Sequence, residues 1–243
     1  MLCHCPTVRL GAALCALLTA SCSDGSVALF DGQTLTGWQV ARADGEGLPA
    51  EQIFTVDTEG IHVYAGAAQG SAQPIATLVT ELEYSHFVLE FEYKWGQNRF
   101  GERSDTARDA GVLFHVHTNV SQVWPPSLEM QMGTSDLDGR WVTGDAFILG
   151  GSTRATVQGQ VATEGRFRTT VRAEKPVGQW NQLRLTVHGS ESATYELNGT
   201  ELNSLGSFEK DMGGAYVPLE RGRIALQAEY AELWYRNIRI REL

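Results

Sequence analysis

Apolar and polar residues alternate in short stretches along most of this sequence, whereas apolar residues almost nowhere recur at helical spacing. The clearest stretch is 86–95, in which every second residue is Phe, Leu, Tyr or Trp and the charged residues Glu90, Glu92 and Lys94 lie between them. A period of two is typical of a β-strand with one buried face and one polar face. This pattern predicts an all-β protein.

Further stretches with the same character are expected to form strands. They are residues 60–65, 76–80, 111–117, 166–172, 182–188, 223–229 and 232–241. Residues 193–202 predict a hairpin, because Asn198-Gly199 supplies the positive φ angles of a type I′ turn. The polar segments 97–108 and 150–165 are expected to be loops that rim a binding face. This many strands, without an internal repeat or linker, indicates one antiparallel two-sheet sandwich.

The first 21 residues have the character of an export signal. Arg9 precedes the short apolar run 10–18, and Thr19-Ala-Ser-Cys22 is similar to a bacterial lipobox, in which the cysteine is lipidated. The alternative is a plain secretory signal. We therefore expect a signal peptide over 1–21, a tether over 22–28 and one domain over 29–243. The protein would be anchored at the outer membrane through Cys22, or would otherwise be periplasmic or secreted.

Cysteine usage and charge restrict the chemistry of the domain. All four cysteines lie within the first 22 residues, which excludes disulfides and cysteine metal sites from the rest of the chain. Without residues 1–21, which contain Arg9, 18 Lys and Arg stand against 29 Asp and Glu, a net charge of −11. This balance argues against nucleic acid and anionic lipid surfaces as partners.

The stretch 127–133 is the most informative for function. Leu and Met residues alternate there with Glu129 and Gln131, and Trp124-Pro125-Pro126 precedes it. The carboxylate and the amide share one face of the predicted strand. That face indicates the wall of a cleft for a polar ligand, and the alternative is a solvated outer strand face.

Several motifs together resemble the 3-keto-disaccharide hydrolase domain family. Residues 29–32 and 35–38 resemble its N-terminal signature, and Asp109-Ala-Gly-Val-Leu-Phe-His-Val resembles its NSGIFFHV strand. The remaining matches are Leu128-Glu-Met-Gln (PEMQ), Gly144-Asp145 (GD), Lys175-Pro-Val-Gly-Gln-Trp-Asn (KPVGEWN), Tyr195-Glu-Leu-Asn-Gly (its hairpin), and 224–229 with 235–239 (its C-terminal end). Two positions differ: Ala228-Glu229-Tyr230 replaces Asp-His-Gly, and Asp109-Ala110 replaces Asn-Ser.

The resemblance implies a concanavalin A-like jelly roll that acts on sugars whose C3 hydroxyl has been oxidised to a ketone. Such a ketone acidifies the C2 proton, so a base can remove it and the C1 oxygen can leave by β-elimination, with net hydrolysis if water adds back. This route needs a base, an acid and donors toward the enolate oxygen. Because Gln131 cannot ionise, the paired-carboxylate chemistry of ordinary glucanases is disfavoured. A separate oxidoreductase would have to make the ketone.

The candidate site residues follow from these motifs. Glu129 is the first choice for the acid or base, with Asp145, which could instead cap a loop, and Glu229 as further carboxylates. Expected substrate-binding residues are His115, His117, Gln131, Gln227 and the ring residues Trp124, Trp141 and Tyr230. His115 is expected to share a strand face with Leu113 and His117. A divalent metal is possible, but no spacing indicates one, and no cofactor is required. The alternative function is a non-catalytic surface lipoprotein that binds carbohydrate on the same jelly roll.

Overall fold

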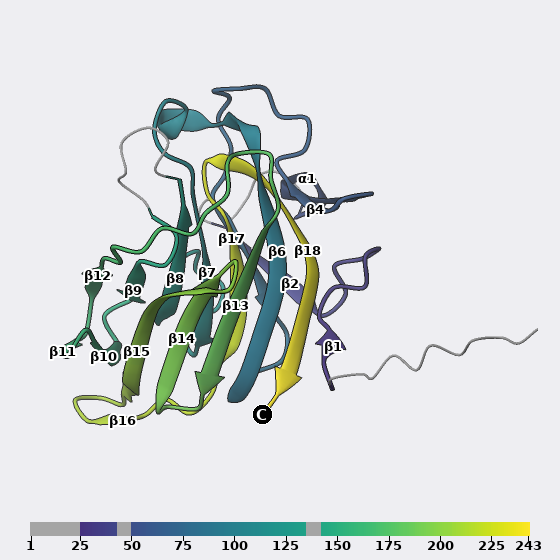
Figure 1. The fold of residues 1–243 in the computed structure, drawn as a ribbon. Coiled ribbons are helices and arrows are strands. Elements are labelled where there is room, and N and C mark those ends of the chain that lie inside the picture. Colours follow the sequence, from purple (N-terminus) through teal and green to yellow (C-terminus); the bar gives the residue numbers. More distant parts are fainter. Residues whose placement is uncertain (1–24, 43–49, 135–141) are drawn as a thin grey trace, which may run out of the picture.

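The computed structural model describes residues 25–42, 50–134 and 142–243, and it confirms an all-β sandwich of two antiparallel sheets (Figure 1). The larger sheet runs in the order β11 (Gln160–Ala162), β10 (Thr153–Val157), β15 (Thr200–Asp211), β14 (Ser192–Leu197), β13 (Asn181–His188), β6 (His86–Arg99), β18 (Ala231–Glu242), β4 (Gly60–Val63) and β3 (Phe54–Asp57). At its sides, β1 (Val27–Ala28) pairs with β18 and β16 (Tyr216–Pro218) with β15.

The smaller sheet positions the candidate site. Its order is β12 (Gly165–Phe167), β9 (Ala146–Leu149), β8 (Ser127–Gly133), β7 (Asp109–Val116), β17 (Arg223–Ala228), β5 (Ala76–Thr80) and β2 (Trp38–Arg42). Short helical turns are α1 (Ala50–Ile53) before β3 and the 3₁₀ turn η1 (Gly101–Arg103) after β6. In the described part of the chain, no helix is long and apolar enough to cross a membrane.

The main core lies between the two sheets, as the alternation in β6 predicts. The alternating apolar side chains of β6 are all buried, from Phe87 to Trp95, and they pack with Leu128, Met130 and Met132 of β8 in one hydrophobic cluster. Since neighbouring residues of a strand point to opposite faces, Glu129 and Gln131 must point to the outer face of the smaller sheet. The hydrophobic pattern of β8 therefore sets the position of its two polar side chains.

The predicted hairpin is confirmed. Strands β14 and β15 pair, and Asn198 and Gly199 between them have φ angles of 50° and 78°. A type I′ turn requires this left-handed backbone at both central positions.

Two other expectations were wrong. Segment 150–165 is not a loop, because it contains β10 and β11, which pair with each other. The strand expected over 166–172 ends at Phe167, since the chain beyond is held by Thr169, whose backbone N donates to Asp145 and whose hydroxyl donates to Leu202 O.

The alternation expected through His115 breaks at a bulge. Between its pairs with Ala225 and Arg223 of β17, strand β7 contains one residue more than its partner. His115 has a φ of 51° there, and the extra residue reverses the inside–outside order that follows. As a result Val116, not His115, joins Leu113 in a small outer-face cluster with Ala225. The expectation that His115 shares a face with Leu113 was therefore wrong.

Candidate functional site

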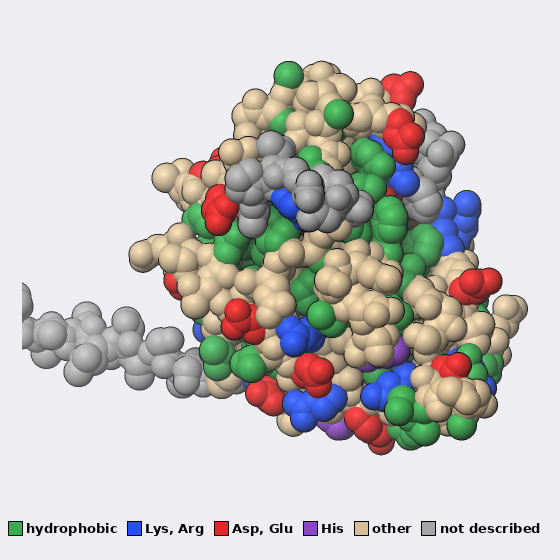
Figure 2. Space-filling view, turned by 180° about the vertical axis from the view of Figure 1, so that it is seen from behind, with side chains coloured by type: hydrophobic (Ala, Val, Ile, Leu, Met, Phe, Trp, Pro, Cys, Tyr) green, Lys and Arg blue, Asp and Glu red, His purple; other side chains and the backbone are tan. Residues whose placement is uncertain are grey.

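A small cavity opens on the outer face of the smaller sheet, where β8, β7 and β17 lie side by side. Its volume is about 210 Å³, and it is lined by Arg103, Asp109, Trp124, Glu129, Gln131, Phe147, Leu149 and Glu229. Seen from behind the view of Figure 1, hydrophobic side chains gather in the middle of the molecule with charged ones around them (Figure 2). The cavity thus combines an acidic cluster with apolar walls, a composition suited to a polar ligand that also has apolar faces.

The carboxyl group of Glu129 fits on this face of the sheet because a residue beside it on the adjacent strand, Gly111, has no side chain. Gly111 of β7 pairs with Gln131 of β8, and a Cβ atom added to Gly111 would overlap Glu129 Oε1 and come within 2.7 Å of Gln227 Oε1. The missing side chain therefore leaves space for the carboxyl of Glu129 and the amide of Gln227. Any larger residue at position 111 would displace one of them.

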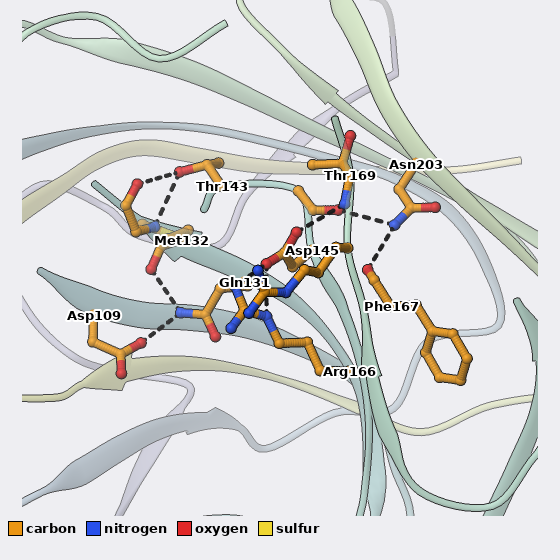
Figure 3. Close-up of polar contacts among 12 residues, drawn as sticks. Asp109, Gln131, Met132, Thr143, Asp145, Arg166, Phe167, Thr169 and Asn203 are labelled. Carbon is orange, nitrogen blue, oxygen red and sulfur yellow. Dashed lines mark hydrogen bonds and ion pairs between the residues drawn. The ribbon is translucent and has the colours of Figure 1, made fainter. Parts of the chain in front are cut away.

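Gln131 holds a neighbouring carboxylate in place. Its side-chain Nε2 lies 2.5 Å from Asp109 Oδ1, 2.7 Å from Ala110 O and 2.8 Å from Met132 O, so its donors are occupied within the protein (Figure 3). Its contacts place Gln131 as a residue that positions Asp109. The expected direct contact with substrate would have to come from its carbonyl oxygen.

Arg103 brings a positive charge to the acidic cluster from the turn that follows β6. Its Nη1 forms an ion pair with Asp109 Oδ2 and lies 3.0 Å from Glu229 Oε1. Its guanidinium carbon also lies 4.8 Å from the centre of the Tyr230 ring, at a distance typical of a cation–π contact. The guanidinium of Arg103 therefore connects Asp109 of β7 with Glu229, the residue that follows β17.

The environment raises the pKa values of all three carboxyl groups. Burial, followed by the charges of Glu229 and Asp109, raises the pKa of Glu129 well above its usual range, and the Gln227 amide acts in the opposite direction. Burial and the Glu229 charge raise the pKa of Asp109, against Arg103 and Gln131. Burial raises the pKa of Glu229, against Arg103 and a hydrogen bond from Trp124. Burial and mutual repulsion therefore make all three carboxyl groups more prone to hold a proton than a free carboxyl group.

Gln227 is a buried amide beside Glu129. Only 1% of the residue is exposed, and neither its Nε2 nor its Oε1 meets hydrogen-bond geometry with a described residue, although the amide is near enough to influence the pKa of Glu129. A buried amide without partners is costly, and such groups are unusual outside functional sites. A ligand hydroxyl or carbonyl next to Glu129 would supply the missing partner.

The structure does not bring the two candidate histidines to this cavity. His115 is fully buried, its Nε2 lies 2.8 Å from Gly189 O, and its ring contacts Phe208. His117 Nε2 lies 3.0 Å from Thr153 Oγ1. Burial lowers the pKa of each to about 4, so both are neutral at physiological pH. The bulge in β7 is the reason that alternation misplaced them.

Asp145 also lies outside the cavity, in a separate polar network. It is fully buried; its Oδ2 accepts a hydrogen bond of 2.8 Å from Arg166 Nε, and its Oδ1 accepts one of 2.8 Å from the backbone N of Thr169 (Figure 3). These contacts fit the loop-capping alternative for Asp145. They occupy both carboxylate oxygens within the protein.

The ring residues expected at the site have different positions. Trp124 lines the cavity and 45% of it is exposed. Tyr230 lies at the edge, where its ring stacks on Arg103 and its hydroxyl donates to Glu102 at 3.4 Å. Trp141 and Cys22 lie outside the described residues.

Sequence reasoning missed Arg103 and Asp109 as site residues. In the sequence, Asp109 stands out only as a departure from a family motif, and Arg103 belongs to a polar segment without a motif of its own. The available signal was a glycine two positions after Asp109: Gly111 pairs with Gln131 of the adjacent strand, two positions after Glu129. Within the described ranges, no three His, Cys, Asp or Glu side chains are grouped so that they could hold a metal ion.

Comparisons with known proteins agree with this fold. Residues 25–241 match the model of the 3-keto-alpha-glucoside-1,2-lyase-like domain family. Among solved structures, the chain is similar to a "putative glycosyl hydrolase" from Parabacteroides distasonis (18% identity, 90% of this chain and 99% of the other, TM-score 0.58). It is also similar to the Bacillus licheniformis β-glucanase (12%, 91% and 100%, TM-score 0.50). No curated protein matches the chain.

Proposed function

The chain belongs to the 3-keto-alpha-glucoside-1,2-lyase-like domain family and is therefore carbohydrate-active, and on that premise we propose that its acidic cavity cleaves 3-keto-glycosides. The observation that carries the proposal is that three buried carboxyl groups, Asp109, Glu129 and Glu229, line one cavity, where Arg103 pairs with the first and the last. A site that only binds sugar does not need several buried carboxyl groups, because burying them costs free energy. A site that transfers protons to and from a substrate does need such groups.

The proposed reaction divides the protons between two carboxyl groups. Glu229, beside Arg103, takes the C2 proton, and the electron pair moves into the enolate of the C3 ketone. The enolate then re-forms the ketone, a C1–C2 double bond forms, and the C1–O bond breaks. Glu129, whose raised pKa favours the protonated form, gives its proton to the leaving oxygen. Addition of water to the double bond completes a hydrolysis, and without it the reaction ends as a lyase.

The remaining residues support charge and geometry. Arg103 offsets the negative charge that develops on the enolate, and the unpaired amide of Gln227 supplies a donor next to Glu129. Asp109, held by Gln131, anchors Arg103 between the strands. The substrate's ketone has to be made beforehand by a separate oxidoreductase, since nothing in this route oxidises C3.

The direct test is incubation in D₂O with a 3-keto-disaccharide and, separately, with its unoxidised parent. Mass spectrometry should show cleavage of the keto sugar alone, with deuterium at C2 of recovered substrate or hydrolysed product. Cleavage of the parent at an equal rate would contradict the ketone requirement. Binding of sugars without any turnover would instead support a carbohydrate-binding protein.

We also propose that the domain is exported and anchored through Cys22, from the lipobox-like residues that precede it. Replacing Cys22 with Ala should move the protein from the membrane fraction to a soluble or unprocessed form. Fractionation and mass analysis of the mature N-terminus provide the measurement. Membrane association that persists in the variant would exclude the anchor.

A further inference from the structure

A second hollow adjoins the carboxylate cavity and has Trp124 as a shared wall. Its volume is about 340 Å³, and it is lined by Arg42, Ser121, Gln122, Val123 and Trp124. The carboxylate cavity is lined by Trp124 as well, so this residue borders both hollows. A ligand that extends past Trp124 from the carboxylates would therefore enter this hollow.

The wall of the second hollow is fixed by hydrogen bonds to the sheet. Thr77 of β5 is buried, and its hydroxyl donates to Val123 O at 2.9 Å. The backbone N of Gln122 donates to Asn119 O at 2.8 Å, and Asn119 has the positive φ of 49° that closes this turn. Val123 is only 4% exposed. These contacts hold the segment that carries Trp124 over the outer face of the smaller sheet.

The sizes of the two hollows suggest how a substrate divides between them. Pockets that hold drug-sized ligands usually measure about 300–1,000 Å³. The carboxylate cavity, at about 210 Å³, is below this range and suits a single sugar ring. Together with the second hollow of about 340 Å³ it falls within the range. The two hollows joined at Trp124 thus match a ligand of two rings.

We propose that the second hollow is the leaving-group subsite, which binds the sugar ring attached to the C1 oxygen of the substrate. This inference rests on the proposed function. The chemistry of the walls fits a neutral ring with hydroxyl groups: Ser121 and Gln122 are exposed polar side chains, and the indole of Trp124 offers an apolar face for C–H groups. The carboxylate cavity would hold the oxidised ring, and the glycosidic bond would pass the edge of Trp124.

The test compares two substrates that differ only in the leaving group, a 3-keto-disaccharide and the methyl 3-keto-glycoside of the same oxidised sugar. Ser121→Trp fills the second hollow without touching the carboxylates. It should lower kcat/KM for the disaccharide by about 10-fold or more, the usual effect of lost pocket contacts, and change the methyl glycoside less than about twofold. Gln160→Trp, on exposed β11, is the matched control. Equal loss on both substrates, or no loss on either, would overturn the proposal.

Binding measurements keep this test separate from the test of catalysis. Calorimetric titration with the unoxidised disaccharide and its methyl monoglycoside reports the second hollow without turnover. Tighter binding of the disaccharide, lost in Ser121→Trp and retained in Gln160→Trp, supports the subsite even if the wild type cleaves neither keto sugar and the proposed function fails. Equal affinity for the two ligands, or an unchanged preference in Ser121→Trp, overturns it.

Discussion

Two acidic sites on the smaller sheet differ in how their charge is balanced. The carboxylate of Asp145 accepts hydrogen bonds from the guanidinium of Arg166 and from the backbone N–H of Thr169. In the cavity, Arg103 is shared between Asp109 and Glu229, while the Glu129 carboxyl has the Gln227 amide nearby. The pKa values of Asp109, Glu129 and Glu229 are accordingly all raised, with burial as the largest cause. A carboxylate whose negative charge is balanced by several donors stabilises a loop. A carboxyl group with fewer donors and a raised pKa can exchange protons with a substrate.

Among the substitutions that test this comparison, Glu129→Gln should have the largest effect, a loss of turnover. The substitution keeps the size of the side chain but removes the ionisable group, so kcat should fall by about 10²–10⁴, the usual contribution of positioned proton transfer. Because burial already favours the uncharged form of Glu129, the melting temperature should change little. Kinetics with a 3-keto-disaccharide and thermal unfolding provide the two measurements.

The counterpart, Asp145→Asn, tests the other half of the comparison. The substitution removes the charge that pairs with Arg166, whose side chain is only 15% exposed, so stability should fall by about 3 kcal/mol. The kcat of the fraction that remains folded should stay near that of the wild type. If Asp145→Asn instead loses turnover with an unchanged melting temperature, Asp145 is catalytic and the contrast between the two sites is wrong.

Asp109→Asn should change how stability depends on pH. The folded-state pKa of Asp109 is raised, so the folded protein keeps this proton at pH values at which the unfolded chain, with a pKa of about 4, has lost it. Wild-type stability should therefore fall as pH rises above about 4, by up to about 1.4 kcal/mol per pH unit and proton. The variant should show a shallower decline. Urea unfolding at pH 5 and pH 8 measures the difference.

The exposed Asp105, in the same loop region, provides the matched control for this experiment. Asp105→Asn should keep the wild-type difference in stability between the two pH values. A decline in Asp109→Asn as steep as in the wild type would show that Asp109 ionises normally in the folded protein, and that Arg103 compensates it fully.

Much of the fold and part of the site could be predicted from the sequence, for local reasons. Alternation in β6 and β8 decides which side chains enter the core, so it also places Glu129 and Gln131 outside it. The Asn198-Gly199 turn needs only its own two residues. Such features depend on neighbours in the chain, which a single sequence displays.

Features that depend on pairing between distant segments could not be predicted in this way. The bulge at His115 exists only relative to β17, more than a hundred residues later, and it reverses the face on which His115 lies. Asp145 meets Arg166 across a separation of 21 residues. Arg103 reaches Glu229 because β6 and β18 pair, which places the turn after β6 beside the chain that precedes β18. A periodic pattern contains none of this information.

Substitutions of Trp124 should have the smallest effect. This residue contributes to the carboxylate cavity in two ways. Its exposed ring is available for a sugar, and its hydrogen bond lowers the pKa of Glu229. Trp124→Ala should raise KM by about threefold to tenfold, as expected for the loss of one ring contact of about 0.5–1.5 kcal/mol. Because 45% of the residue is exposed, the melting temperature should hardly change. A large fall in melting temperature with an unaltered KM would show that this ring supports the fold instead.

Trp124→Phe separates the two roles, since it keeps a ring but removes the indole N–H. Without that donor the pKa of Glu229 should rise further, because the hydrogen bond favours the ionised carboxylate. If Glu229 is the base, it must be ionised to act, so the acidic limb of the kcat/KM profile should move to higher pH while KM at the optimum stays close to the wild-type value. An acidic limb that does not move would mean that Glu229 is not the base, and Asp109 would then be the remaining carboxylate beside Arg103 that can take the C2 proton.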